Sequence, residues 1–483
     1  MSMAWPNPRH LVVERIDVRV GIEPVLVAFA AAPGPAILES SRPGGKYGRF
    51  SIFASDPVEV LEIDRASGVC PFRFLGERLA VLPPIDGQAP VIPFMGGWIG
   101  FWAYEAGLQT ERIGYRSETT PGAPGPLPLA RFGLYDHAVV YDHGEEQWYG
   151  TAVEWPASVA ARRPTAAQRL DALRARVRAA ADKTRSDACA APTTEPLTPG
   201  IERSDYLTAV ERVQRYIEAG DVYQVNLTQR FTTRTSASPV ALYRRLRRMN
   251  PSSHAALLLW DDIAVLSSSP ELFLDVRRGH VVTRPIKGTR PRVGVPRIDA
   301  AYRRELATSE KERAELNMIV DLLRNDLGRV CSFGSVRVTE PGEIEEHPTV
   351  FHRVATIEGD LAPGGSLIDL LRATFPGGSV TGAPKIRAMQ ISHELEPTPR
   401  GVYCGSIGWI GLDGAMSFNL AIRTIVQRGD RVSLYAGGAI VADSTPETEY
   451  DETITKLTGM LRALNCDPPS GSLTAEVAEL AAT

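Results

Sequence analysis

Hydrophobic residues in the first third of the chain recur in short runs that glycine and proline separate. Between residue 10 and about residue 155 these runs are LVVERIDVRV, VEVLEI, AVLPP, GGWIGFWAY and HAVVYD. Short apolar or alternating runs bounded by turn residues are typical of β-strands. This part of the chain is therefore predicted to consist of strands joined by turns.

The hydrophobic pattern changes between residues 157 and 200. ASVAARRPTAAQRLDALRARVRAAADK is rich in alanine and arginine and predicts a helix, whereas the following TRSDACAAPTTEPLTPG has the small polar residues and prolines of a linker. We predict an N-terminal domain over residues 1–190, a linker over 191–200, a second domain over 201–466 and a mobile tail over 467–483.

The second half of the chain alternates helical patterns with runs of strand-like segments. Helices are predicted after Ser204, over residues 299–327, and near the end, where Ser444 or Thr445 would cap a helix with Pro446 in its first turn. The strand-like runs include VYQVNLTQRF, AALLLW, LFLDV, HVVTRP and RVSLYAGGAIV. Strands in runs with interspersed helices predict an α+β fold, a large and mostly antiparallel β-sandwich surrounded by helices.

Composition and charge narrow the functional classes. Lys plus Arg is 53 and Asp plus Glu is 57, which gives a net charge of −4 and argues against a protein that binds nucleic acid electrostatically. No uninterrupted apolar run approaches the ~18 residues of a membrane-spanning helix, and the first residues lack the apolar core of an export signal. The five cysteines have neither metal-ligand nor redox spacing, so we expect a reduced, cytoplasmic protein.

Two predicted helices each place a pair of glutamates on a face that continues with apolar or mixed residues. At 100° per residue the two stripes are Glu312, Glu315, Ile319 and Leu323, and Glu449, Glu452, Lys456 and Met460. Carboxylates on a buried face need a compensating partner, and several hard oxygen ligands suit Mg²⁺. A solvated glutamate face is the alternative for either helix.

Three further features point to anions or to a nucleophile. FPGGSVTGAPKIRAMQ is a glycine-rich turn that leads into a helix at Pro384, where free N–H groups attract anions, although a structural turn explains it equally well. Lys287 in RPIKGTRPR would be a nucleophile if burial lowered its pKa, and is otherwise a surface lysine. Arg423, predicted within one continuous strand FNLAIRTIV, requires a protein or substrate carboxylate if it is half-buried. Together these features indicate an enzyme for a small anionic substrate.

The second half resembles the chorismate-utilising enzyme family in ordered motifs over about 260 residues. They are SSSPELFL, RPIKGTRPR, AELNMIVDLLRNDLGRV, FHRVATIEGDL, FPGGSVTGAPKIRAMQIS, GVYCGSIGWIG, FNLAIRT and GGAIVADSTPETEYDETITK. The first half is similar, through ILESSRPGGKYGRFSIFASDP, to the N-terminal region of the ammonia-using branch. The resemblance implies an anthranilate-synthase-like fold whose residues 201–466 bind chorismate.

The resemblance also implies roles for individual residues. Mg²⁺ would be held directly by Glu315 and Glu452, with assistance from Glu312 and Glu449. The residues that would contact chorismate are Gly288, Thr289, His352, Tyr403, Arg423, Gly437, Gly438, Ala439 and Lys456. The family usually has a third glycine where this chain has Ala439, so a methyl group intrudes there while the backbone N–H is kept.

Two positions would select the reaction. Water-using members of the family carry a lysine base where this chain has Gln224, and a neutral amide cannot deprotonate water, so an ammonia user is expected. Anthranilate synthases usually have alanine where this chain has Lys287, and lysine there is typical of aminodeoxychorismate synthase component I. Lys287 would then attack the substrate covalently, with Glu271 as general acid. An anthranilate synthase with an atypical lysine and a non-catalytic paralogue that binds chorismate or tryptophan are the alternatives.

Two expectations concern ligands other than chorismate. The sequence has no glutaminase motif with a glycine-flanked nucleophilic cysteine, so ammonia is expected from a separate glutamine amidotransferase. Some relatives have a tryptophan site, of which this chain keeps Glu39 and Ser40. It lacks the Tyr-Met of that site in NPSSHA, which begins at Asn250, so tight feedback inhibition by tryptophan is not expected.

Overall fold

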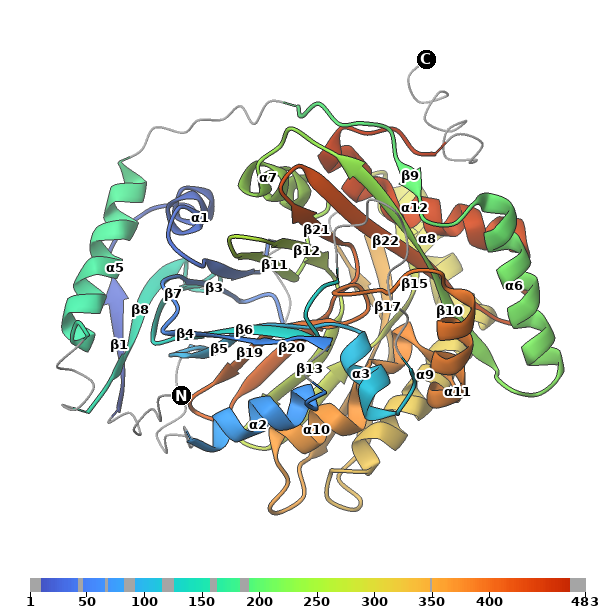
Figure 1. Cartoon of the computed structure of the whole chain (residues 1–483), viewed down its shortest axis with the longest axis horizontal. Helices are drawn as coiled ribbons and strands as arrows, with labels where there is room; N and C mark the ends of the chain where they lie inside the picture. Colours follow the sequence, from blue (N-terminus) through green and yellow to red (C-terminus); the bar gives the residue numbers. More distant parts are fainter. Residues whose placement is uncertain are drawn as a thin grey trace.

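Two large antiparallel β-sheets packed face to face, with helices on both outer surfaces, form the protein (Figure 1). The structure is a computed structural model that describes residues 10–41, 47–65, 68–81, 92–114, 126–156, 163–182, 191–347 and 350–469. The predicted α+β class with its mostly antiparallel sandwich is confirmed. Most of the predicted mobile tail lies outside the described residues.

The first sheet joins strands from both ends of the chain. In spatial order its strands are β1 (His10–Ile16), β8 (Gln147–Glu154), β7 (His137–Asp142), β3 (Phe50–Ala54), β2 (Ala36–Glu39), β11 (His254–Leu259), β12 (Ala264–Ser269), β21 (Thr424–Arg428), β22 (Arg431–Ile440), β10 (Gln224–Arg234) and β18 (Gly382–Ala383), with β9 (Thr198–Pro199) paired to β10.

The second sheet is built in the same way. Its strands are, in order, β15 (Ile286–Pro291), β17 (Val350–Asp360), β14 (His280–Arg284), β13 (Leu272–Arg277), β20 (Met416–Leu420), β19 (Ser406–Gly411), β5 (Gly97–Trp102), β6 (Ala130–Tyr135) and β4 (Glu59–Ile63), with β16 (Arg337–Glu346) paired to β17. Strands from before and after the predicted linker pair directly, β2 with β11 and β5 with β19. Each sheet therefore contains strands from both predicted domains.

The helices cover the outer faces of the sheets. They are α1 (Ile22–Ala30), α2 (Pro71–Val81), α3 (Glu105–Thr110), α5 (Ala166–Ala181), α6 (Arg203–Glu218), α7 (Pro239–Met249), α8 (Pro296–Thr308), α9 (Glu310–Gly328), α10 (Leu367–Thr374), α11 (Lys385–Leu395) and α12 (Pro446–Leu464), with a short 3₁₀ turn η2 (Gly378–Val380). None of these helices, within the described residues, is both long and apolar enough to cross a membrane.

Strand alternation divides the core into three layers. On β2, Ile37 packs outward with helices α1, α5 and α7, whereas its neighbour Ala36 packs between the two sheets. On β5, Trp102 packs outward with α2 and α3, and Phe101 faces the space between the sheets. Successive side chains of a strand point to opposite faces, and because both faces are covered, these strands are apolar on both sides.

Several local predictions were wrong. The predicted helix over residues 299–327 is two helices, because Ser309 adopts an extended conformation (φ −61°, ψ 111°) and its Oγ accepts a hydrogen bond from the Glu312 N–H to begin α9. The predicted cap Ser204 lies inside α6. Of the two predicted caps of α12, Thr445 holds the N-cap position, but its hydroxyl bonds to the Thr448 hydroxyl and makes no capping hydrogen bond. In the strand-rich first third, α1, α2 and α3 were missed, and AVLPP begins within α2.

The predicted continuous strand around Arg423 was also wrong. β20 ends at Leu420 in the second sheet and β21 begins at Thr424 in the first, so the chain crosses between sheets at this point. Arg423 has a φ of 50°, in the left-handed region that strands do not use. The predicted alternation of faces through residues 419–425 therefore does not apply. Of the helix predicted over residues 157–183, the part from Ala166 to Ala181 is confirmed as α5, whose Thr165 forms a capping box with Gln168, and residues 157–162 lie outside the described residues.

Candidate active site

Lys287 lies among carboxylates that come from three different elements. It sits on β15, next to Gly288, which approaches Glu312 of α9. Burial raises the pKa of Glu271 and Glu315, and the charge of Lys287 opposes this rise; with Lys456 it also helps to lower the pKa of Glu452. Such electrostatic effects require short separations in a partly buried site. The structure thus brings Lys287 together with the predicted acid and with one glutamate from each predicted glutamate pair.

Glu271 is a buried carboxyl group between β12 and β13, with 4% of its surface exposed. Burial raises its pKa to about 7, although hydrogen bonds from the Ser379 hydroxyl (2.6 Å to Oε1) and the Ile286 backbone and the charge of Lys287 oppose this rise. A carboxyl group with a pKa near neutrality can both donate and accept a proton at physiological pH. Glu271 therefore has the proton affinity that a general acid needs.

The two glutamate pairs approach glycines on the strands opposite them. A Cβ atom added to Gly288 would lie 3.0 Å from Glu312 Oε2, and one added to Gly438 would lie 2.8 Å from Glu449 Oε2. Gly288 also has a φ of 87°, which side-chain-bearing residues rarely adopt. Each glycine therefore leaves space for a carboxylate oxygen against the backbone.

Burial raises the pKa of both Glu315 and Glu449, and Glu452 raises them further. Glu449 accepts a hydrogen bond from the Ser444 hydroxyl through Oε1, but its buried Oε2 has no hydrogen-bond partner in the described part of the chain. Within the same residues, no group of three or more acidic, histidine or cysteine side chains is arranged to hold a metal ion by itself. The site thus contains neighbouring, incompletely compensated carboxylates from α9 and α12.

Lys456 of α12 lies against the β22 backbone. Lys456 donates a hydrogen bond to the Gly437 carbonyl (2.9 Å) and pairs with Glu452 (2.6 Å). Gly437, Gly438 and Ala439 lie within β22, opposite Thr228, Leu227 and Asn226 of β10. The predicted backbone cradle is therefore part of a strand, next to the lysine and the second glutamate pair.

Arg423 is a cation without an acidic partner in the described residues. Its guanidinium donates to the Asn250 side-chain oxygen (3.1 Å), and burial lowers its pKa. A half-buried guanidinium paired only with an amide is an incompletely neutralised charge, which favours binding of an anion. The sequence led us to expect either a protein carboxylate or a substrate carboxylate beside Arg423. Among the described residues, no protein carboxylate pairs with it.

The remaining predicted residues occupy two places. Thr289 is paired with His352 across β15 and β17, and its hydroxyl lies 2.9 Å from His352 Nδ1. Tyr403 is buried and stacks on Tyr435, with ring centroids 5.3 Å apart. Thr289 and His352 are thus on the Lys287 side of the site.

Two buried polar side chains near this site were not predicted to bind substrate. Ser379 of η2 holds Glu271, and the glycine-rich sequence gave only a general expectation of anion binding for this turn. Gln224, at the start of β10, is completely buried, and neither its Nε2 nor its Oε1 has a hydrogen-bond partner among the described residues. A buried amide with two unpaired polar atoms is costly unless a ligand pairs with it.

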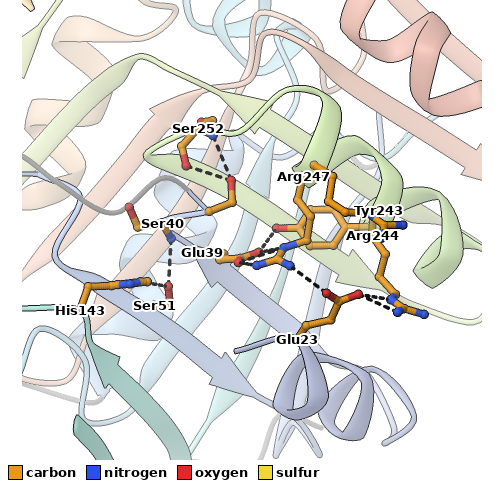
Figure 2. A network of polar contacts seen from close by, with 11 residues as sticks. Glu23, Glu39, Ser40, Ser51, His143, Tyr243, Arg244, Arg247 and Ser252 are labelled. Carbon is orange, nitrogen blue, oxygen red and sulfur yellow. Dashed lines mark hydrogen bonds and ion pairs between the residues drawn. The ribbon is translucent and has the colours of Figure 1, made fainter. Parts of the chain in front are cut away.

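The region of Glu39 lies elsewhere, at the end of the interior strand β2 of the first sheet (Figure 2). Arg247 pairs with Glu39 (Nε to Oε2 3.0 Å) and the Tyr243 hydroxyl donates to the same carboxylate (3.0 Å). The Ser40 N–H donates to Ser51. Glu39 also lines a cavity of about 1260 Å³ between the two sheets. Its charge is neutralised by the chain's own arginine, and weak tryptophan inhibition stays a prediction.

Comparison with known proteins finds a family model, relatives and a solved structure that each match most of the chain. A family model described as chorismate binding enzyme matches residues 36–462. Aminodeoxychorismate synthase component 1 of Salmonella typhimurium is 37% identical over 450 residues, covering 89% of this chain and 93% of the relative. Anthranilate synthase component 1 of Pseudomonas aeruginosa is also 37% identical, over 462 residues that cover 91% and 92%. The crystal structure of anthranilate synthase component I from Streptococcus pneumoniae matches with a TM-score of 0.73 and 33% identity, over 86% of this chain and 93% of that one.

Proposed function

Because the chain belongs to the chorismate binding enzyme family, we propose that it is component I of an aminodeoxychorismate synthase, which converts chorismate and ammonia into 4-amino-4-deoxychorismate and water. Relatives named for this reaction and relatives named anthranilate synthase are equally similar overall, so the proposal rests on the site. The observation that carries it is that Lys287 shares one site with Glu271, Glu315 and Glu452, on whose pKa values its charge acts.

The first chemical step forms a covalent bond to Lys287. After Lys287 has released its proton to solvent, its neutral amine attacks ring C2 of chorismate, both ring double bonds shift, and the bond from C4 to its hydroxyl breaks. Glu271 donates its proton to the leaving oxygen, which departs as water, and the attached lysine nitrogen carries the positive charge. A carboxyl group with a pKa of about 7 is protonated often enough to do this at neutral pH.

The second step returns the lysine. Ammonia attacks C4, both ring double bonds shift back, and the bond between C2 and the Lys287 nitrogen breaks, which restores the neutral amine. The new C4 ammonium gives a proton to the Glu271 carboxylate, so both residues return to their starting states. Gln224 favours ammonia because its neutral amide accepts a hydrogen bond from ammonia but is too weak a base to activate water.

The residues of α9 and α12 fit a magnesium ion. The unpartnered Glu449 Oε2, the raised pKa values of Glu315 and Glu449, and the glycine beside each pair all favour an added cation. Mg²⁺ commonly uses one or two carboxylates together with water and substrate oxygens, which suits a site without three converging ligands. Glu315 and Glu452 would hold the ion directly, with Glu312 and Glu449 assisting, and it would neutralise the ring carboxylate of chorismate.

This metal proposal predicts a specific effect of Gly438→Ala. The new methyl group would displace Glu449 Oε2, which is the free end of a side chain, so the fold should tolerate the change. We expect the Mg²⁺ concentration for half-maximal binding, measured by calorimetry with chorismate present, to rise roughly 10- to 100-fold. Gly328→Ala is the control, since no atom lies within 4 Å of its added Cβ. Equal Mg²⁺ affinity in both variants would contradict the proposed ligand set.

Ammonia is expected from a separate glutamine amidotransferase subunit. Glutamine hydrolysis by a cysteine requires a reactive thiolate. Burial raises the pKa of Cys331 to about 11 and of Cys404 to about 12, and it also raises that of Cys466. These thiols are therefore poor nucleophiles, and the component 1 names of the relatives are consistent with a second subunit.

The role of Gln224 predicts a change of nucleophile. A lysine in this buried position would lose its charge to desolvation and become a base. We expect Gln224→Lys to form an isomer of chorismate, in which water adds to C2 while the C4 hydroxyl leaves as water, with amination reduced about tenfold or more. Gln224→Met, which has no base, should lose amination without forming the isomer. Chromatography that finds no hydroxylated product from Gln224→Lys would remove Gln224 from this role.

Product analysis tests the proposed function directly. With chorismate, a magnesium salt and an ammonium salt, the product should retain the enolpyruvyl group and no pyruvate should be released. Glutamine alone should give no product in the absence of a partner. Anthranilate together with an equal amount of pyruvate would instead identify the chain as an anthranilate synthase.

A further inference from the structure

We propose that Arg400 is a positioning residue for this reaction, because it ties the turn that carries Ser379 to the strand that carries Gln224. This inference rests on the proposed function and adds a residue that the reaction itself does not use. Arg400 follows α11 in the chain and is 1% exposed. It therefore acts from beneath the site, without contact with solvent.

Every side of the Arg400 guanidinium is engaged. Nη1 donates to the Val380 carbonyl (2.9 Å), and Nη2 donates to the Asn226 carbonyl (2.7 Å). Nε and Nη2 also pair with the two oxygens of Glu396, at 2.8 and 2.7 Å. The cation lies 4.3 Å from the centre of the Tyr104 ring. A planar, five-donor group is needed to reach two separate carbonyls and one carboxylate at once.

The two carbonyls belong to the segments that carry functional side chains. Val380 follows Ser379 in η2, and the Ser379 hydroxyl holds Glu271 (2.6 Å). Asn226 lies two residues beyond Gln224 on β10, and its N–H bonds to the Thr381 carbonyl, just past η2. Arg400 thus fixes the position of Ser379, which influences the protonation of Glu271, relative to the strand that carries Gln224.

The counter-charge is itself anchored to the same strand. Glu396 Oε1 accepts a hydrogen bond from the Thr228 N–H on β10 (2.9 Å), so the ion pair and the strand move together. Glu105 of α3 also binds the Arg400 and Gly401 N–H groups, at 2.7 and 3.2 Å from Oε1. A buried, charged network with its partners satisfied is rigid, and removing one member leaves the others uncompensated.

Replacing Arg400 should therefore change the pKa of Glu271, because it weakens the hydrogen bond from Ser379. If η2 shifts, the Ser379 hydrogen bond weakens, and because that bond lowers the pKa of Glu271, the pKa rises. Lysine keeps the charge of Arg400 but cannot contact both carbonyls and Glu396 in a fork. Arg400→Lys therefore tests the geometry separately from the charge.

The experiment is a set of pH profiles of kcat/KM for chorismate amination in wild type, Arg400→Lys, Ser379→Ala and the double variant. We expect Arg400→Lys to lower kcat about 10- to 100-fold with little change in KM, and to move the alkaline limb to higher pH, as Ser379→Ala does. The double variant should move it no further than Ser379→Ala alone, because both changes act through one hydrogen bond.

Arg169→Lys is the matched control, since Arg169 is equally charged and buried but binds Asp136 and the Val153 carbonyl beside α5. An Arg400→Lys enzyme with a wild-type pH limb, or shifts that add in the double variant, would overturn the inference. If Arg400→Lys does not fold, Glu396→Gln provides the same test with the same two outcomes. An alkaline limb that persists in Glu271→Gln would show that another group is the acid and would overturn the inference, whereas the proposed function fails only if product analysis finds anthranilate and pyruvate.

Discussion

Replacing Lys287 with alanine is expected to reduce the amination of chorismate by roughly 10³- to 10⁶-fold, the range seen when a covalent nucleophile is removed. Without the amine, C2 of the ring has no protein nucleophile, and ammonia would have to displace a poorly activated hydroxyl directly. Folding and chorismate binding should change little, because Lys287 is only half-buried and on a short edge strand. Steady-state kinetics with saturating ammonium and a chorismate titration measure this loss in kcat.

Lys287→Arg separates nucleophilicity from charge. Arginine keeps the cation that lowers the pKa of Glu271, Glu315 and Glu452, but its guanidinium is always protonated and cannot attack carbon. We expect this variant to be as inactive as Lys287→Ala. Recovery of most of the activity in Lys287→Arg would mean that the lysine acts only through its charge.

Replacing Glu271 with glutamine is expected to lower kcat by about 10²- to 10⁴-fold, since the leaving hydroxyl would no longer receive a proton. Glutamine has nearly the same shape and can accept the Ser379 hydrogen bond, so the site geometry should persist. Wild-type kcat/KM should fall as the pH rises through about 7, where Glu271 loses its proton, and the variant should lack this limb. A variant that retains the limb would show that another group is the acid.

The same substitution should change the pH dependence of stability. The pKa of Glu271 is raised from 4.5 to about 7 on folding, so the folded state binds more protons than the unfolded state between these values. Stability from this group is therefore lost as the pH rises from about 4.5 to 7. Glutamine does not ionise, so the melting temperature of Glu271→Gln relative to wild type should increase over that range.

Local sequence patterns predicted the fold class. They did not predict where a helix breaks or where the chain passes from one sheet to the other, because tertiary contacts determine those positions. Short apolar runs bounded by turn residues identified most strands of both sheets, because strands that are covered on both faces are apolar on both sides. The break at Ser309 was missed because helical periodicity continues through it, and only the serine side chain marks a new start. The change of sheet at Arg423 was missed because an apolar run gives no sign of which sheet each part joins.

The charged residues of the candidate site were predicted from the sequence. The residues that hold them in position were not. The glutamate pairs follow from helical spacing, and the resemblance supplied Lys287 and Glu271, which the structure brings together. Ser379 and Arg400 carry no local signal, since a serine in a turn and an arginine after a helix are common on surfaces. Their importance depends on contacts with residues more than 100 positions away in the chain, which only the fold reveals.

The most direct test of the covalent route is mass spectrometry of the protein mixed with chorismate and Mg²⁺ in the absence of ammonia. We predict an adduct on the peptide that contains Lys287, with the mass of chorismate less one water, which disappears when ammonium is added. Lys287→Arg should show no such adduct. A wild-type protein that carries no adduct, together with normal turnover by Lys287→Ala, would contradict the proposed mechanism.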